Sequence, residues 1–229
     1  ITAQNPRRVI GIEACSAKII RDQIAAVFDQ LPPRAIKTGM MFSSEIICEV
    51  AGALHRRRCP VVVDPVMIAT SGARLLKANA VKILTNKLFP LATLVTPNIP
   101  EAEALLGISL REPEELRAAA RAFHERFGCA ALIKGGHLAN TREAIDVFFD
   151  GKTELLLSSP RVRGVKTHGT GCTYSAAVAA HLARGEKLAR AVELAKAFVT
   201  SAIVNSRRAN GHDVLGFQFS IREPAGRRG

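Results

Sequence analysis

Lys166-Thr167-His168-Gly169-Thr170-Gly171-Cys172-Thr173-Tyr174-Ser175 runs directly into the alanine-rich residues 176–180, and the rest of the chain is organised around this stretch. Its two glycines form a flexible turn, and the residues after them are strong helix formers. The free N–H groups and the dipole of such a helix start favour a bound anion such as phosphate. Cys172 falls on the first helical turn, where we expect the pKa of its thiol to be lowered. The stretch therefore suggests phosphoryl transfer.

Two ordinary explanations of this stretch stay open at this point. A glycine turn before a helix also occurs where nothing binds. A lone cysteine is often a small buried hydrophobic residue rather than a base. The remaining sequence has to distinguish these explanations from a phosphate site.

The composition indicates a globular protein with reduced thiols. The 229 residues suit one large α/β domain or two small ones, and 48% of them are apolar. The five cysteines are odd in number and scattered, which argues against a disulfide framework or a zinc site and for a cytoplasmic location. No apolar run reaches the roughly 18 residues that a membrane span needs.

The formal net charge of +12 and the pI of about 10.1 raise nucleic acid as a partner. However, the basic residues are spread thinly apart from Arg56-Arg57-Arg58 and Arg227-Arg228, and no aromatic residues interleave with them to stack on bases. The arginine triplet falls where we expect a helix to end, and cations there favour the helix dipole. We therefore expect small-molecule ligands and no specific nucleic-acid partner.

The order of the expected elements predicts an α/β fold, with a mostly parallel central sheet and helices on both faces. Short apolar runs indicate strands at 35–37, 61–63, 93–96 and 130–133. Helical periodicity and end signals indicate helices at 16–31, 43–55, 77–88, 100–106, 113–127, 170–184 and 188–206. Residues 144–149 and 153–157 flank Asp150-Gly151, which predicts an antiparallel hairpin added to one end of the sheet.

We expect one domain over residues 1–222 and a disordered basic tail over residues 223–229, because neither a repeat nor a linker interrupts the chain. Residues 1–5 read like a strand that enters a loop. Since an independent domain rarely opens so abruptly, we expect that residues upstream of Ile1 are missing.

A glycine or a polar residue follows each expected parallel strand: Gly39, Asp64, Asn98 and Lys134. Ligands of open α/β sheets bind outside these carboxyl ends. Asp64 and Glu101 are expected to hold Mg²⁺ directly or through water, and Lys134 is expected to neutralise a transferred phosphate. Ordinary roles stay open for the same residues, because Asp64 and Asn98 suit turns and Glu101 suits a helix cap.

Several blocks of the sequence together resemble a known family. They are TAQN at 2–5, KTGM at 37–40, VDPVMIATSG at 63–72, TPNIPEAEALLG at 96–107, IKGGH at 133–137 and HGTGCT at 168–173. The chain resembles the hydroxymethylpyrimidine/phosphomethylpyrimidine kinase of thiamin biosynthesis, a branch of the ribokinase-like kinases. The resemblance covers about residues 1–211, and the last block is the most specific. Other ribokinase-like enzymes place an aspartate where Cys172 stands.

The resemblance implies a function and a set of site residues. The function is ATP-dependent phosphorylation of 4-amino-5-hydroxymethyl-2-methylpyrimidine and of its monophosphate, with Mg²⁺, and we expect a homodimer. The implied catalytic residues are Cys172, Lys134, Gly169 and Gly171, the two glycines through their N–H groups. The implied pyrimidine-pocket residues are Gln4, Met40, Val66 and Cys172. The implied nucleotide-binding residues are Asn98, Glu101, Lys134, Thr167, Gly169 and Gly171. The implied metal-site residues are Glu101 and, in the outer shell, Asp64.

Two alternatives remain beside this interpretation. A pyridoxal- or pyridoxine-type vitamin kinase shares the sheet and the anion site, although Cys172 and residues 64–67 favour the pyrimidine. A catalytically silent nucleotide-binding module is the other alternative. The family opens with a further strand and a glycine-rich loop over the pyrimidine, and this sequence does not contain them.

Overall fold

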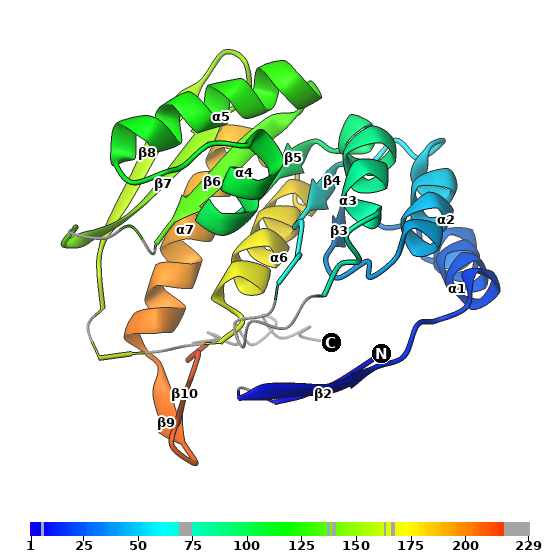
Figure 1. Ribbon diagram of the computed structural model, residues 1–229, viewed down its shortest axis with the longest axis horizontal. Coiled ribbons are helices and arrows are strands. Elements are labelled where there is room, and N and C mark those ends of the chain that lie inside the picture. The colour runs from blue at the N-terminus through cyan, green and yellow to red at the C-terminus, as the bar shows by residue number, and fades with distance from the viewer. Residues whose placement is uncertain are drawn as a thin grey trace, which may run out of the picture.

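The computed structural model describes residues 1–5, 7–68, 75–136, 138, 141–162, 164–165 and 168–217. Figure 1 shows a central sheet with helices on both of its faces. The strand order in this sheet is β3-β4-β5-β6-β7-β8. The predicted α/β fold is therefore confirmed. Thr167 and the expected tail at 223–229 lie outside the described residues.

The sheet combines a parallel part with an antiparallel hairpin, as the sequence predicts. Its parallel strands are β3 (Ile36–Thr38), β4 (Val61–Val63), β5 (Leu94–Val95) and β6 (Ala130–Gly135). The antiparallel strands that follow β6 are β7 (Glu143–Phe149) and β8 (Glu154–Pro160). Asp150 Oδ1 accepts the N–H groups of Lys152 and Thr153 at 2.9 and 2.7 Å, which stabilises the turn between them.

Local capping residues set the ends of most helices. The helices are α1 (Ala17–Gln30), α2 (Ser44–Leu54), α4 (Ile99–Leu106), α5 (Pro113–Phe127), α6 (Thr170–Ala183) and α7 (Leu188–Val204). The hydroxyls of Ser16 and Ser43 cap the starts of α1 and α2. Gly107 and Gly128 end α4 and α5 with φ of 75° and 71°, a conformation that suits glycine. These boundaries agree with the sequence-based ones to within a few residues.

Residues 77–88 do not form the single regular helix that the sequence predicts. The segment forms a short α3 (Ala80–Ile83), then a π-helical turn η1 (Leu84–Leu88) and a 3₁₀ turn η2 (Phe89–Leu91). No side chain caps any of the three pieces. Leu84, Leu88 and Phe89 are buried in the core. Packing of these large side chains therefore fixes the segment where local signals for a regular helix are weak.

Alternating residues of each central strand face two separate layers. Val61 and Val63 belong to a core cluster that includes residues of α2, α4 and α5, whereas Val62 belongs to a cluster with α6 and α7. In β6, Ile133 and Leu132 divide in the same way. Strands buried on both faces read as continuous apolar runs, which is why the sequence reveals them.

Two small hairpins were not predicted. β1 (Thr2–Asn5) pairs with β2 (Arg8–Ile12), although the sequence indicates only one strand there. β9 (Arg207–Ala209) pairs with β10 (His212–Val214) across Asn210 and Gly211, both with positive φ. An Asn-Gly pair between short segments is a strong hairpin signal, and it would have predicted this second turn.

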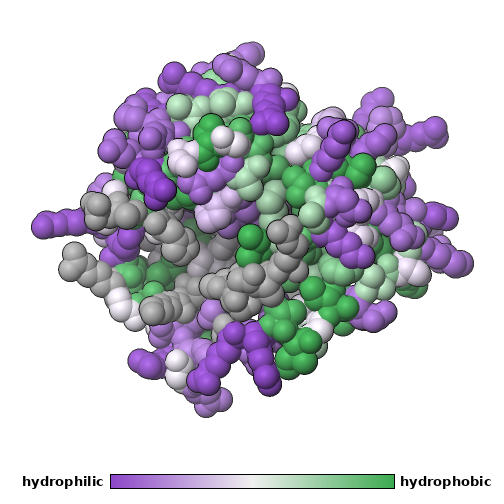
Figure 2. All heavy atoms as spheres, viewed as in Figure 1, coloured by the Kyte–Doolittle hydropathy of each residue, from purple (hydrophilic) through white to green (hydrophobic). Residues whose placement is uncertain are grey.

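Figure 2 shows hydrophilic residues over the helices at the top and right, and hydrophobic residues in the lower part of the same face, near β1 and β2. Ile1 and Ile10 of this hairpin region are 81% and 67% exposed.

Among the described residues, no helix is both long enough and apolar enough to cross a membrane.

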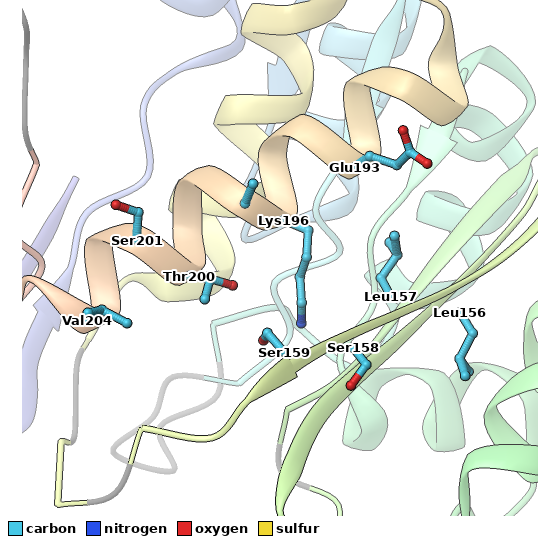
Figure 3. Close-up of a pocket in the computed structure, with 10 residues that line it drawn as sticks. Leu156, Leu157, Ser158, Ser159, Glu193, Lys196, Thr200, Ser201 and Val204 are labelled. Carbon is cyan, nitrogen blue, oxygen red and sulfur yellow. The ribbon is translucent and has the colours of Figure 1, made fainter.

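An open groove of about 600 Å³ runs between β8 and α7. Figure 3 shows Leu157, Ser158 and Ser159 of β8 on one side of it and Lys196 and Thr200 of α7 on the other. Lys196 extends toward the sheet, where its Nζ lies 2.7 Å from Asp146 Oδ2. The groove thus ends on a structural ion pair rather than on the residues that the sequence singles out.

Candidate active site

Backbone hydrogen bonds align the chain just beyond the carboxyl ends of the parallel strands. Asp64 N donates to Thr38 O at 3.1 Å, Thr96 N to Val63 O at 2.9 Å, and Lys134 N to Pro97 O at 2.9 Å. The sheet ladder therefore continues past the strands and places their polar residues side by side. The start of α6 lies at this same edge (Figure 1), since Ser175 Oγ donates to Asp64 Oδ2 at 3.1 Å.

Asp64 lies at the centre of this cluster, and its side chain is only 3% exposed. Lys134 Nζ lies 3.0 Å from Oδ1 and Lys37 Nζ lies 3.8 Å from Oδ2. The hydroxyls of Ser175 and Thr96 donate to the same carboxylate, at 3.1 and 3.4 Å. Burial of a charge is tolerated here because the carboxylate has two cations and two hydrogen-bond donors.

Asn98 and Glu101 form a capping box at the start of α4. Asn98 Oδ1 accepts the Glu101 N–H at 2.9 Å, and Glu101 Oε2 accepts the Asn98 N–H at 2.9 Å. Glu101 Oε1 also accepts the Met67 N–H at 3.4 Å. Glu101 therefore has the capping role that the sequence left open, and Asn98 caps α4 rather than stabilising a turn. They also lie beside the Asp64 cluster, because Asn98 bridges Lys134 in parallel register.

The carboxylates of Asp64 and Glu101 suit a Mg²⁺ ion that keeps several of its waters, rather than a site in which every ligand is a protein group. Glu101 is 6% exposed, and burial raises the pKa of its carboxyl, while Lys134 and the Asn98 N–H partly lower it. The described residues contain no group of three or more His, Cys, Asp or Glu with metal-site geometry. Mg²⁺ commonly uses one or two carboxylates together with substrate phosphates and waters, so two carboxylates suffice.

The start of α6 has the geometry of an anion site. Gly169 precedes the helix with φ of 80°, and the Thr173 N–H returns to Gly169 O at 2.8 Å. A Cβ added at Gly171 would lie 3.1 Å from Lys134 Nζ, so the lysine ammonium rests against this glycine. Helix N–H groups and an ammonium thus face the same space, and both favour phosphate.

The expected lowering of the Cys172 pKa is wrong. Desolvation, the negative charge of Asp64 and a hydrogen bond to Asp64 raise the pKa of this thiol, and the cations of Lys37 and Lys134 only partly oppose them. The residue counts as exposed, yet the carboxylate beside it favours the protonated thiol. The helix start alone would lower the pKa of this thiol. The sequence around Cys172 does not show that Asp64, from the end of β4, lies beside it.

The four residues assigned to the pyrimidine pocket lie on four different segments, with Cys172 on α6. Met40 is half-buried just after β3, and its Sδ accepts the Thr2 hydroxyl at 3.3 Å. Val66 is half-buried two positions after Asp64, and its N–H donates to Asp64 O at 2.8 Å. Gln4 lies exposed on β1. The structure therefore brings Met40 together with β1 and Val66 together with Asp64, while Thr167 lies outside the described residues.

Sequence reasoning missed three members of the cluster: Lys37, Thr96 and Ser175. Thr96 directly follows β5, so the rule that locates Asp64 would also have located it, whereas Lys37 lies within β3 and that rule does not find it. Ser175 lies one helical turn after Gly171, and its Oγ also approaches Gly171 O at 3.2 Å. A search for polar residues one turn into the helix would have included it.

The fold and this edge are typical of a phosphotransferase, because the start of α6, Lys134 and the buried carboxylates of Asp64 and Glu101 gather at one edge of the sheet. The sequence pattern of the phosphomethylpyrimidine kinase family matches residues 1–215. The chain therefore belongs to the phosphomethylpyrimidine kinase family.

Individual relatives agree with this family. A hydroxymethylpyrimidine/phosphomethylpyrimidine kinase of Rhizobium meliloti is 46% identical over 204 residues, which are 89% of this chain and 76% of that protein. The thiamine biosynthesis bifunctional protein ThiED of Geobacter sulfurreducens is 47% identical over 205 residues, but the match spans 89% of this chain and only 41% of that protein. An ADP complex of Bacillus subtilis pyridoxal kinase has a TM-score of 0.82 at 34% identity, covering 93% of this chain and 82% of that one.

Proposed function

We propose that this chain transfers a phosphoryl group from ATP to 4-amino-5-hydroxymethyl-2-methylpyrimidine and to its monophosphate, in thiamin biosynthesis. The observation that carries the proposal is the contact of Lys134 with both Asp64 and the glycine turn of α6, at 3.0 Å from Asp64 Oδ1. The names of the Rhizobium and Geobacter relatives supply the substrate class and the pathway. The ADP complex of the similar pyridoxal kinase supports an adenine nucleotide as donor.

In this proposal each residue has a distinct task. The N–H groups of Gly169 and Gly171 hold the transferred phosphate, and Lys134 stabilises charge as it moves to the leaving phosphate. Asn98, Glu101 and Thr167 belong to the nucleotide side, where Glu101 and, from the outer shell, Asp64 would hold Mg²⁺. Bound Mg²⁺ would supply charge neutralisation between the phosphates.

On the acceptor side, Gln4, Met40 and Val66 hold the pyrimidine ring. Cys172 stays a neutral thiol, because the pKa of its thiol is raised by desolvation and Asp64. It therefore orients the acceptor hydroxyl rather than removing the proton beforehand. Phosphoryl transfer through a loose transition state asks little of a protein base, so this weaker role is sufficient.

The test is an ADP-release assay with MgATP and three acceptors: hydroxymethylpyrimidine, its monophosphate and pyridoxal. We expect both pyrimidines to be used with a higher kcat/KM than pyridoxal, and activity to disappear with EDTA. The Lys134→Met variant serves as the low-activity control, because we expect its kcat to be about 100-fold lower. Higher kcat/KM for pyridoxal would overturn the proposal.

The same assay addresses two other functions. A pyridoxal-type vitamin kinase is favoured by the structural similarity to the Bacillus pyridoxal kinase, although the identity of 34% is lower than the 46% with the Rhizobium pyrimidine kinase. Nucleotide binding without ADP release on any acceptor would indicate a silent binding module. A cytoplasmic location and a homodimeric state stay predictions, which cell fractionation and light scattering with size-exclusion chromatography would check.

A further inference from the structure

We propose that Lys37 determines specificity for the second acceptor, because its ammonium binds the phosphate of the already phosphorylated pyrimidine. This inference rests on the proposed function and goes beyond it by assigning the two phosphorylations different residue requirements. It concerns a lysine that lies in the KTGM block at 37–40 but to which the sequence analysis assigned no role.

Lys134 and Lys37 contact Asp64 in similar ways, each through a different carboxylate oxygen. Lys134 Nζ lies 3.0 Å from Oδ1, and Lys37 Nζ lies 3.8 Å from Oδ2. Each ammonium also rests against a glycine, since an added Cβ would lie 3.1 Å from Lys134 Nζ at Gly171 and 2.9 Å from Lys37 Nζ at Gly39. Both glycines therefore leave room for a cation beside the backbone.

The two lysines approach Asp64 from opposite directions along the sheet edge. Lys37 comes from β3, on one side of β4, and Lys134 comes from β6, beyond β5 on the other side. Lys134 bridges Asn98 and therefore belongs to the expected nucleotide side. Lys37 lies three residues before Met40, which contacts Thr2 of β1 on the expected pyrimidine side. The positive charges of Lys37 and Lys134 both lower the pKa of Cys172, so both ammonium groups act on this thiol.

Lys37 has the weaker of the two ion pairs with Asp64, whereas Lys134 also faces the carboxylate of Glu101. Asp64 can neutralise one ammonium, and Lys134 has the shorter contact of the two. Lys37 is held less firmly, at the outer limit of an ion pair, with its side chain 23% exposed. Its ammonium can therefore exchange Asp64 for an incoming anion at little cost in lost hydrogen bonds.

Only one of the two acceptors needs this cation. The hydroxymethyl group is neutral, whereas a phosphate monoester carries about −1.5 to −2 charge at pH 7 and repels the γ-phosphate of ATP. A cation beside the acceptor phosphate reduces this repulsion as the two phosphates approach. The second reaction therefore requires a positive charge that the first does not.

The experiment compares Lys37→Gln with the intact protein on both acceptors. We expect kcat/KM for the monophosphate to fall about 10- to 100-fold, the usual effect of losing one charge-assisted hydrogen bond, and kcat/KM for the alcohol to change by less than about fivefold. Lys37→Arg should restore most of the activity on the monophosphate. Lys77→Gln is the matched control, because Lys77 Nζ lies over the Phe42 ring at 4.9 Å and its replacement removes the same charge away from Asp64.

An equal loss on both acceptors in Lys37→Gln would overturn the inference, because Lys37 would then only position Asp64. Calorimetric binding of the pyrimidine monophosphate and of the alcohol gives a readout that does not depend on turnover. We expect Lys37→Gln to weaken binding of the monophosphate alone. Equal binding of the monophosphate by both proteins overturns the inference. Failure of the intact protein to phosphorylate either pyrimidine contradicts the proposed function instead.

Discussion

Lys134 Nζ lies 3.0 Å from Asp64 Oδ1 and against the backbone of Gly171, so one ammonium joins β6, the end of β4 and the start of α6. The three elements are distant in sequence, and they share the property that each ends or begins at the same sheet edge. A cation at this junction reaches both the buried carboxylate and the space in front of the helix N–H groups. This contact is the basis of the first prediction.

Lys134→Met should lower kcat by about 100-fold and raise the KM for ATP much less. A cation that follows charge onto the leaving phosphate contributes more to the transition state than to the ground state. Gly171→Ala should have a smaller effect in the same direction, because the added Cβ would lie 3.1 Å from Lys134 Nζ and displace it. Steady-state kinetics checks both. A change confined to the KM for ATP would make Lys134 a ground-state contact.

Cys172 should react with iodoacetamide more slowly than the exposed Cys48 at pH 7. Its raised pKa means that the reactive thiolate is scarcer than for an ordinary thiol and increases only as the pH rises above the usual thiol range. Cys129, buried and with a pKa raised to about 12, should be the slowest. Peptide mapping by mass spectrometry measures the three rates. Fastest labelling at Cys172 at neutral pH would show that the thiol is activated after all.

Asn98→Ala should lower the free energy of unfolding by about 1 kcal/mol, because it removes the side chain that caps α4. Asn98→Ser keeps a capping oxygen and should restore most of this stability. Both variants should require more Mg²⁺ for half-maximal activity if the amide also serves the nucleotide side. Urea unfolding and Mg²⁺ titrations separate the two effects. Wild-type Mg²⁺ dependence in Asn98→Ser would leave the residue with only its capping role.

Lys196→Met should lower the free energy of unfolding by about 3–5 kcal/mol, because it leaves the Asp146 carboxylate buried and unpaired. Lys196 Nζ lies 2.7 Å from Asp146 Oδ2, and Asp146 Oδ1 also accepts the Gly135 N–H at 2.9 Å. Burial raises the pKa of Asp146, and Lys196 opposes this increase. Urea unfolding measures the loss.

The double variant Asp146→Asn, Lys196→Met should recover part of the lost stability, because both charges are gone while the amide oxygen still accepts the Gly135 N–H. Arg190→Met is the matched surface control. It breaks a pair whose side chains are 58% and 41% exposed, so we expect a change of at most about 1 kcal/mol. Similar losses in Lys196→Met and Arg190→Met would show that the buried pair has no special importance.

The sequence by itself determined the elements whose signals are local. Ser16 and Ser43 indicate helix starts through their own side chains, and runs such as Val61–Val63 indicate strands buried on both faces. The Asp150-Gly151 turn fixed the β7–β8 hairpin for the same reason. The rule that ligands bind beyond the carboxyl ends of parallel strands then placed Asp64, Asn98 and Lys134 at one edge from their positions in the chain alone.

Only the tertiary structure decided which of these residues touch and in which protonation state they act. Residues 77–88 take α and π turns, and a 3₁₀ turn follows them, because buried side chains rather than caps hold the segment. Ser175 and Asp64 are 111 positions apart, and Lys37 meets Asp64 from a neighbouring strand. The pKa of Cys172 is raised, whereas the sequence predicted that it would be lowered. The reason is that desolvation and the charge of Asp64, which follows a distant strand, outweigh the local field of the helix start.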